Sequence, residues 1–152
     1  MADTTIDDFT PSLLDTAATL FVVVFNAPPW SERWTEALAR NRLNDVLATP
    51  GFAGVALHQG NDLCGFALGH IEQWSTGRHF HLQEMCVRTD RQRSGIGTAL
   101  INALEVRLSG VEQLYLLTAR EGPAHWFYEH CGFRPARRQG VMLKRLLGTT
   151  QE

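Results

Sequence analysis

The junction at residues 92–97 constrains the fold of this chain more than any other segment. Its sequence, Gln-Arg-Ser-Gly-Ile-Gly, follows an extended run that ends near Val87 and precedes a segment in which Leu100, Leu104 and Leu108 recur at helical spacing. Two glycines let the backbone turn tightly there, and the free amides that open a helix attract anions. The pattern predicts a strand, a phosphate-binding loop and a helix in succession.

The segment after this helix extends the pattern to a strand-helix-strand unit. Residues 113–117, Gln-Leu-Tyr-Leu-Leu, form a nearly continuous apolar run that is typical of a strand buried on both faces. Two strands joined through a helix pair in parallel by a right-handed crossover. We therefore expect a parallel pair of strands around the glycine loop.

Caps and periodicity divide the rest of the chain. Thr10 and Pro11 are typical of a helix start, Pro50 and Gly51 end a second helix, and residues 60–61 are typical of a hairpin turn. The expected elements are a strand at 5–9, helices from 10 and from 31–32, strands at 52–59, 63–74 and 79–87, a helix up to 109, a strand at 113–117, a helix near 123–131, and extended runs at 133–139 and 141–146. They predict an α/β fold in one domain, residues 1–152, with a mixed central sheet of six to seven strands flanked by about four helices.

Charge and cysteine content narrow the function classes. A net charge of -2 gives no basic field, so nucleic acid and anionic membranes are not expected partners. The apolar run at residues 20–25 is much shorter than the ~20 residues of a membrane helix, and it follows an acidic stretch, unlike a signal peptide. The three cysteines are widely spaced, which disfavours a disulfide scaffold and suits a reducing compartment. We expect a soluble cytoplasmic protein.

Two familiar nucleotide-binding motifs do not fit the glycine loop. A dinucleotide fold requires a third glycine where this chain has Leu100, and an acidic residue at the end of the next strand, which is absent. A triphosphate-binding loop requires Gly-Lys-Ser/Thr, which is also absent. Both nucleotide-binding interpretations of the loop are therefore excluded.

Two motifs resemble the GNAT superfamily of N-acetyltransferases. Residues 92–97 match its acetyl-CoA-binding pattern Gln/Arg-x-x-Gly-x-Gly/Ala, and they follow a strand that ends in Glu-Met-Cys-Val at residues 84–87. Residues 124–133, Ala-His-Trp-Phe-Tyr-Glu-His-Cys-Gly-Phe, match the superfamily's Ala-x-x-Phe-Tyr-x-x-x-Gly-Phe segment. The order of elements is similar along nearly the whole chain. Residues 26–34 further resemble a bacterial subgroup that is similar to aminoglycoside N-acetyltransferases.

The resemblance implies transfer of an acetyl group from acetyl-CoA to a primary amine on a small molecule, by direct attack in a ternary complex. It leaves open acetylation of a protein or peptide, and a non-catalytic acyl-CoA-binding sensor. A homodimer is also left open, because dimers are common in the superfamily. The residues implied to bind coenzyme A are Cys86, Val87, Gln92, Arg93, Ser94, Gly95, Ile96, Gly97 and Thr98.

Acetyl transfer to an amine requires acid-base chemistry. An alkyl amine with a lysine-like pKa of ~10.4 is protonated at neutral pH, so a base must remove a proton before attack. Glu84, just before the end of its strand, is the first candidate, and Glu72, near the end of the neighbouring strand, is the second; a water chain to the base is left open. The resemblance assigns Tyr128 as the acid that protonates the departing thiolate.

Two further positions carry expectations. Glu121 occupies the place where many members of the superfamily have an asparagine that binds pantetheine, so that contact is in doubt. His79 and His81 share a strand face, but the sequence has no third Cys, Asp or Glu at zinc-like spacing beside them. We therefore expect no metal.

Overall fold

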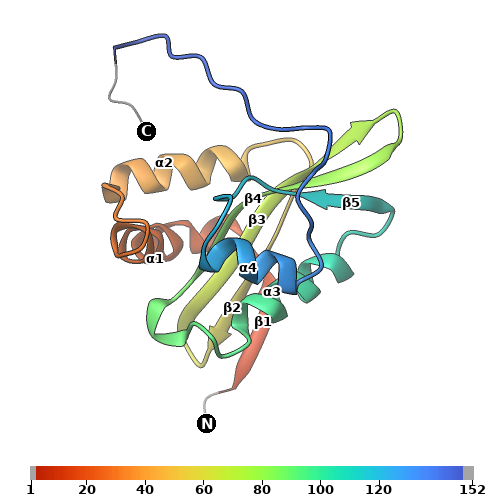
Figure 1. Cartoon of the computed structure of the whole chain (residues 1–152). Helices are drawn as coiled ribbons and strands as arrows, with labels where there is room; N and C mark the ends of the chain where they lie inside the picture. Colours follow the sequence, from red (N-terminus) through yellow and green to blue (C-terminus); the bar gives the residue numbers. More distant parts are fainter. Residues whose placement is uncertain (1–2, 149–152) are drawn as a thin grey trace. The chain divides into compact units, whose positions relative to one another are not determined.

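A computed structural model of the chain describes residues 3–148. Its elements, in chain order, are β1 (Thr4–Asp8), the short 3-10 helix η1 (Pro11–Leu13), α1 (Leu14–Asn26), α2 (Glu36–Leu47), β2 (Phe52–Gln59), β3 (Asp62–Trp74), β4 (Gly77–Val87), a second 3-10 helix η2 (Thr89–Arg91), α3 (Ile96–Val106), β5 (Val111–Tyr115) and α4 (Pro123–His130) (Figure 1). The expected fold class, α/β with a mixed sheet and four α-helices, is confirmed.

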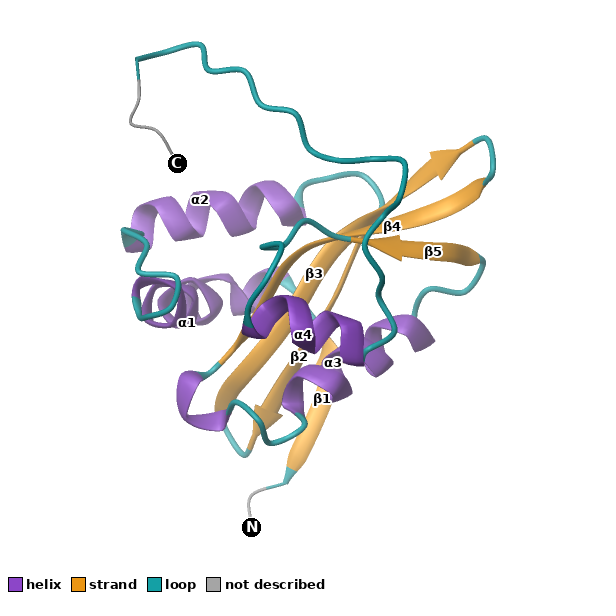
Figure 2. Cartoon of the chain, in the orientation of Figure 1, coloured by secondary structure: helices purple, strands orange, loops and turns teal. Residues whose placement is uncertain are grey.

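The strands form one sheet in the order β1-β2-β3-β4-β5 (Figure 2). The first four strands are antiparallel to their neighbours, and β5 returns through α3 to pair in parallel with β4. The predicted strand-helix-strand unit is therefore correct. Within residues 3–148 the sheet has five strands, fewer than the six to seven expected.

Alternating side chains build an apolar core on each face of the sheet. On one face, Phe66, Leu68 and Cys86 pack with the buried side chains of α1 and α2. On the other face, a Cβ added at Gly65 would meet side chains of α3. Because successive residues of a strand point to opposite faces, α3 covers the face opposite the α1/α2 face.

The pairing of β3 with β4 contains one bulge. Leu68 lies opposite Glu84, whereas Gly69 lies opposite Leu82, so Gln83 is an extra residue in β4. A bulge of this kind interrupts the alternation of side chains along the strand that carries it.

The bulge places two residues of β4 on the same face although they are three positions apart. His81 lies opposite His70, and Glu84 lies opposite Leu68. His70 and Leu68 are two residues apart on β3 and so share the α1/α2 face. Without the bulge, His81 and Glu84 would point to opposite faces of the sheet.

Gly69 makes room for this arrangement. A Cβ at Gly69 would collide with the carbonyl oxygen of His81 and with the ring of Phe80, which is fully buried. Neither a strand carbonyl nor a packed ring can move aside at low cost. Glycine is therefore needed beside the bulge because two neighbouring groups already occupy the space of a side chain.

The second helix begins later than the expected residues 31–32. The side chain of Asn26 accepts a hydrogen bond from the N–H of Trp34 at 2.8 Å and donates to its carbonyl oxygen at 2.9 Å, which holds the preceding segment in a non-helical form. α2 starts directly after Thr35, whose hydroxyl accepts a hydrogen bond from the N–H of Leu38 at 3.1 Å. The prediction missed this cap, although threonine is a favoured residue for it.

The expectation of a buried interior strand at 113–117 is wrong. β5 spans Val111–Tyr115, lies at the edge of the sheet and contains no fully buried residue. The expected extended runs at 133–139 and 141–146 do not form strands either. A strand is stable only when a neighbour completes its hydrogen bonds, and among the described residues β5 pairs with β4 alone.

The chain divides after Thr118 into two compact units. The first contains all five strands with α1, α2 and α3, and the second contains α4. In the second unit the rings of Phe127 and Phe133 flank the Tyr128 ring, with centroids 5.2 and 5.6 Å away. Gly132, with φ +98°, turns the chain after α4, so that the N–H of Phe133 reaches the Tyr128 carbonyl oxygen at 3.0 Å.

The apolar run at residues 20–25 belongs to α1, a helix of 13 residues. No helix in residues 3–148 has both the length and the apolar character needed to cross a membrane.

Replacing Gly69 by alanine should destabilise the fold by about 1–3 kcal/mol, because the added methyl group overpacks the site beside the bulge. Urea unfolding of the two proteins measures the difference. Gly140→Ala is the matched control, since a Cβ there meets no atom within 4 Å. Equal stability of Gly69→Ala and the control would contradict the requirement for glycine.

Candidate functional site

One edge of β4 is open along half of its length. β5 pairs with residues 78–81 of β4, and no described strand pairs with residues 82–87 on that side. The N–H of Arg88 donates to the Cys64 carbonyl oxygen in β3 at 2.8 Å. Because backbone groups alternate between the two edges of a strand, those of Val87 face the open edge and those of Cys86 face β3. Cys86 and Val87 are both expected to bind coenzyme A, and of these two only Val87 has its backbone on the open edge.

The open edge leads into the glycine loop at the start of α3. Gly95 precedes the helix with φ +84°, a left-handed conformation that favours glycine. No side chain caps this helix. The backbone amides of Ile96, Gly97 and Thr98, which begin α3, carry the partial positive charge of a helix N-terminus. The loop thus has the geometry of an anion site.

The residues before Gly95 shape the loop. The side-chain amide of Gln92 donates to the Val87 carbonyl oxygen at 3.2 Å, and the Ser94 hydroxyl donates to the Arg91 carbonyl oxygen. Arg93 has φ +65°, a second left-handed residue in the loop. The contact of Gln92 ties the loop to the end of β4, and that of Ser94 closes a turn within the loop.

The three arginines around this loop have different partners. Arg88 binds Asp90 through two hydrogen bonds of 3.0 and 3.1 Å, and Arg91 donates to the side chain of Gln59. Arg93 forms no ion pair with any described residue. Its guanidinium is the one most able to contribute to binding an anion.

Glu84 is a partly buried carboxylate held by α2. Its Oε1 accepts a hydrogen bond from Nε of Arg42 at 2.7 Å, and its side chain is 14% exposed. Burial raises the pKa of Glu84, while the hydrogen bond and charge of Arg42 act in the opposite direction. A carboxylate with a raised pKa accepts a proton more readily than an ordinary one, which is the property a general base needs.

Glu72 lies in a network of hydrogen bonds near the turn of the β3–β4 hairpin. Its Oε1 accepts from the Tyr115 hydroxyl at 2.7 Å and from the Trp74 indole N–H at 3.1 Å, and its Oε2 lies 3.0 Å from Nε2 of His70. Burial opposes ionisation of Glu72, but these hydrogen bonds outweigh it and lower its pKa. Burial and the bond to Glu72 raise the pKa of Tyr115 to about 12.

The two candidate bases therefore differ in basicity. Glu72 and Glu84 both project from the α1/α2 face of the β3–β4 hairpin. The pKa of Glu84 is raised by burial, whereas that of Glu72 is lowered by its hydrogen-bond donors. Glu84 is the better proton acceptor of the pair.

Cys64 and Cys86 are buried thiols of the β3–β4 hairpin. Cys86 is 1% exposed and packs in the core under α1 and α2. Burial, together with the charge of Glu84, raises the pKa of the Cys86 thiol far above its usual range. Cys86 is therefore a packing residue and not a nucleophile.

The second unit carries the remaining predicted residues. Tyr128 lies in α4 between Phe127 and Phe133. Gly122, directly after Glu121, precedes α4 with φ +110° and leaves that helix without a side-chain cap.

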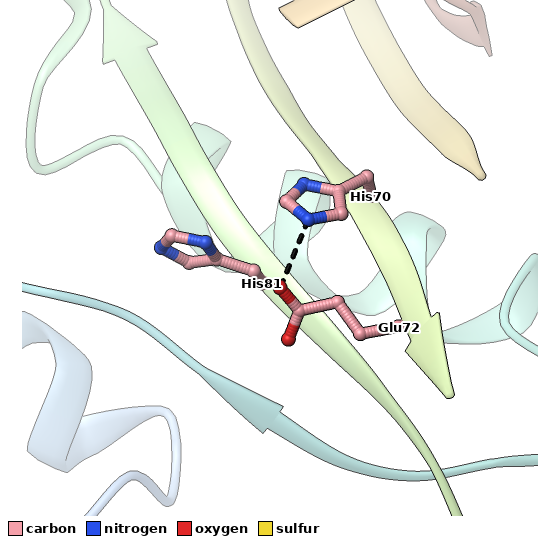
Figure 3. A group of neighbouring side chains, drawn as sticks. All are labelled: His70, Glu72 and His81. Carbon is pink, nitrogen blue, oxygen red and sulfur yellow. Dashed lines mark hydrogen bonds and ion pairs between the residues drawn. The ribbon is translucent and has the colours of Figure 1, made fainter. Parts of the chain in front are cut away.

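The structure brings together three residues that the sequence did not connect. His70, Glu72 and His81 place one ligand atom each within 4.8 Å of the others (Figure 3). The sequence prediction considered His79 with His81, which lie on one strand, and missed the neighbouring strand. The alternation of His70 and Glu72 before the β3–β4 turn was the available signal, because a hairpin places such residues opposite the first residues after the turn.

An open groove of about 740 Å³ lies elsewhere on the first unit. It is bounded by α1, by the turn between β2 and β3 and by residues 88–90. Arg88 and Asp90, which precede the glycine loop, line this groove, whereas Glu72, Glu84 and Gly95 do not.

Residues 50–135, more than half of the 152, match the family described as Acetyltransferase (GNAT) domain. No curated protein sequence matches the chain.

Solved structures that resemble this one include a possible acetyltransferase from Clostridium difficile 630, with a TM-score of 0.78, 13% identity and coverage of 94% of this chain and 98% of that one. Aminoglycoside N-acetyltransferase AAC(6')-Iy in complex with CoA has a TM-score of 0.74 at 16% identity, covering 96% and 97%. Aminoglycoside acetyltransferase meta-AAC0020, from an uncultured soil metagenomic sample and in complex with sisomicin, has a TM-score of 0.69 at 18% identity, covering 95% and 96%. These likenesses concern the fold, and the match over residues 50–135 shows that the chain belongs to the GNAT acetyltransferase family.

Proposed function

We propose that this protein transfers an acetyl group from acetyl-CoA to a primary amine on a small molecule, by direct attack in a ternary complex. The observation that carries the proposal is the continuity of the open edge of β4 with the uncapped start of α3, in a stretch of β4 that also carries the carboxylate of Glu84. An extended donor with a diphosphate at one end and a thioester at the other fits such a path.

The residues of the loop have distinct roles in holding the donor. The amides of Ser94, Gly95, Ile96 and Gly97, with Arg93 and Thr98, bind the diphosphate. Each favourable interaction with the helix dipole contributes about 0.3–1 kcal/mol. The backbone of Val87 hydrogen-bonds the pantetheine arm, and Gln92 steadies the strand end through the Val87 carbonyl oxygen. Cys86 supports this strand from the core.

The proposed reaction requires the protonated acceptor amine to lose two protons, one before and one after it attacks the thioester. Glu84 takes one proton from the ammonium group, directly or through a water, and the neutral nitrogen forms a bond to the thioester carbon. The carbon–sulfur bond then breaks, and Tyr128 donates its proton to the departing thiolate. The amide nitrogen loses its remaining extra proton to water, so that the products are an acetamide and coenzyme A.

The proposal also covers the extent of the domain, the class of acceptor and the compartment of the cell. Residues 1–152 act as one transferase domain, and the likeness to aminoglycoside acetyltransferases favours a small-molecule acceptor. The odd number and wide spacing of the three cysteines suit a reducing cytoplasm. The acetyl transfer itself needs no metal, because the thioester is already activated.

The test is an amine screen that reports release of free coenzyme A thiol, with aminoglycosides, polyamines, amino acids and peptides as acceptors. We expect turnover with at least one small-molecule amine.

Glu84→Gln should lower kcat/KM about 10²- to 10⁴-fold, the usual contribution of general-base catalysis. Tyr128→Phe should lower kcat, and both variants should still bind coenzyme A. Turnover with peptides alone would overturn the small-molecule assignment, and coenzyme A binding without any turnover would identify a sensor.

Gly97→Ala distinguishes a phosphate site from a simple tight helix start. Alanine is the better helix former by up to about 1 kcal/mol, so the variant should unfold at the same or a higher temperature than the wild type. Its methyl group lies at the start of α3, where the diphosphate approaches. The stabilisation by coenzyme A, ~2.7 kcal/mol at 100 times the dissociation constant, should fall sharply in thermal-shift experiments. Undiminished stabilisation would contradict binding of the diphosphate at this helix start.

Removal of the Arg42 guanidinium should move the pH dependence of the reaction. Arg42 lowers the pKa of Glu84 against the effect of burial, so Arg42→Gln should raise that pKa further. A base must be unprotonated to act, so the acidic limb of the kcat/KM–pH profile should shift to higher pH.

The matched control for this profile is Arg40→Gln. Arg40 lies on the same helix and pairs with Asp15, which is 79% exposed, and not with Glu84. Its profile should coincide with that of the wild type. An acidic limb that stays in place in Arg42→Gln would remove Glu84 from the role of base.

A further inference from the structure

The cluster of His70, Glu72 and His81 lies within the first unit and outside the groups used for acetyl transfer. The two histidines face each other across the β3–β4 pair, with ring centroids 5.6 Å apart, and Glu72 lies two residues further along β3. His70 points toward the carboxylate of Glu72, and the His81 side chain lies next to them (Figure 3). Two imidazoles and one carboxylate are a ligand set that zinc sites use.

The contact between Nε2 of His70 and Oε2 of Glu72 is favourable only when a proton or a metal ion lies between the two atoms. Nδ1 of His70 donates its hydrogen to Oε1 of Gln83 at 2.8 Å, so in the neutral ring Nε2 carries a lone pair. That lone pair points at Oε2 of Glu72, an acceptor 3.0 Å away. Two acceptors this close repel unless a proton or a metal ion lies between them.

Each member of the cluster is oriented by a separate partner. Gln83 fixes the ring of His70, while Tyr115 and Trp74 hold Oε1 of Glu72 and leave Oε2 directed at the cluster. His81 stacks on the ring of Tyr115, with centroids 4.5 Å apart and an interplanar angle of 10°. Metal-binding histidines are typically held by a second hydrogen bond of the kind that His70 makes.

His81 completes the set with free ring nitrogens. Neither nitrogen of its ring is hydrogen-bonded to a side chain or backbone group among residues 3–148, although the residue is partly buried. The three ligand atoms lie within 4.8 Å of one another. Tetrahedral coordination with bonds of about 2.0–2.1 Å would place ligand atoms about 3.3 Å apart, so a small closing movement of His81 would suffice.

We propose that His70 Nε2, Glu72 Oε2 and a ring nitrogen of His81 bind a divalent transition-metal ion of the Zn²⁺ type. Three protein ligands leave a fourth position for water or another small ligand. The imidazole and carboxylate donors suit Zn²⁺ and not Mg²⁺ or Ca²⁺, which take oxygen ligands. A Glu72 carboxylate that coordinates the ion cannot accept a proton, so Glu84 remains as the base.

The test is a titration of the full chain with Zn²⁺ in competition with a chromophoric chelator, together with Co²⁺ as a spectroscopic probe. The wild type should bind one ion, and bound Co²⁺ should show d–d absorption without a thiolate charge-transfer band. Gln83→Leu should weaken binding about 10- to 100-fold, as loss of an outer partner does. Glu72→Gln and His81→Gln should each weaken it more than that.

His58→Gln is the matched control, because it removes a histidine of β2 that lies outside the cluster. Its affinity for Zn²⁺ should equal that of the wild type, and thermal unfolding without metal should show each variant folded. Equal binding by the wild type and Glu72→Gln, or no saturable binding at all, would overturn the proposal. So would a result in which Zn²⁺ does not bind and Glu72→Gln instead raises KM for the amine, which would make the cluster an ammonium pocket.

Discussion

The pairing of β3 with β4 is the constraint on which the rest of the site depends. Its single bulge, at Gln83, sets which side chains of β4 share a face with α1 and α2. Gly69 permits that bulge by leaving space for the His81 carbonyl and the Phe80 ring. Because of this register, His81 and Glu84 lie on the same face. β4 therefore presents two titratable side chains on the α1/α2 face. The same bulge directs Gln83 toward His70.

The second constraint is the early end of the β4–β5 pairing. β5 pairs with β4 only up to His81, which lies opposite Tyr115. The following residues of β4, 82–87, have a neighbouring strand on one side only, which is β3. The strand edge then runs into a helix whose first amides have no side-chain cap. Unsatisfied backbone groups are costly when buried and useful when a ligand supplies partners. In this fold they are concentrated where the glycine loop turns the chain.

Electrostatics separates the roles of the two carboxylates. Glu84 has one cationic partner and is largely removed from water, so burial governs its protonation. Glu72 has several donors, which together outweigh burial and favour its charged form. A charged carboxylate beside two imidazoles is suited to holding a cation, and a carboxylate with a raised pKa is suited to accepting a proton. One hairpin thus carries two carboxylates whose pKa values are shifted in opposite directions.

The sequence by itself determined the local features. Residues 52–59 were predicted as a strand with the bounds that the structure has, since alternation and turn residues are local signals. The glycine loop and the family were also accessible, because left-handed backbone at Gly95 and a helix start require particular residues at fixed spacing. Tyr128 was found through its motif, and its role stays a prediction.

Only the tertiary structure decided which distant residues meet. The late start of α2 follows from hydrogen bonds between Asn26 and Trp34, and the exposed position of β5 follows from the lack of a further strand beside it in the described part of the chain. The cluster around Glu72 depends on strand register, which a single bulge changes. Register is set by pairing between segments far apart in the chain, and no local pattern in either segment specifies it.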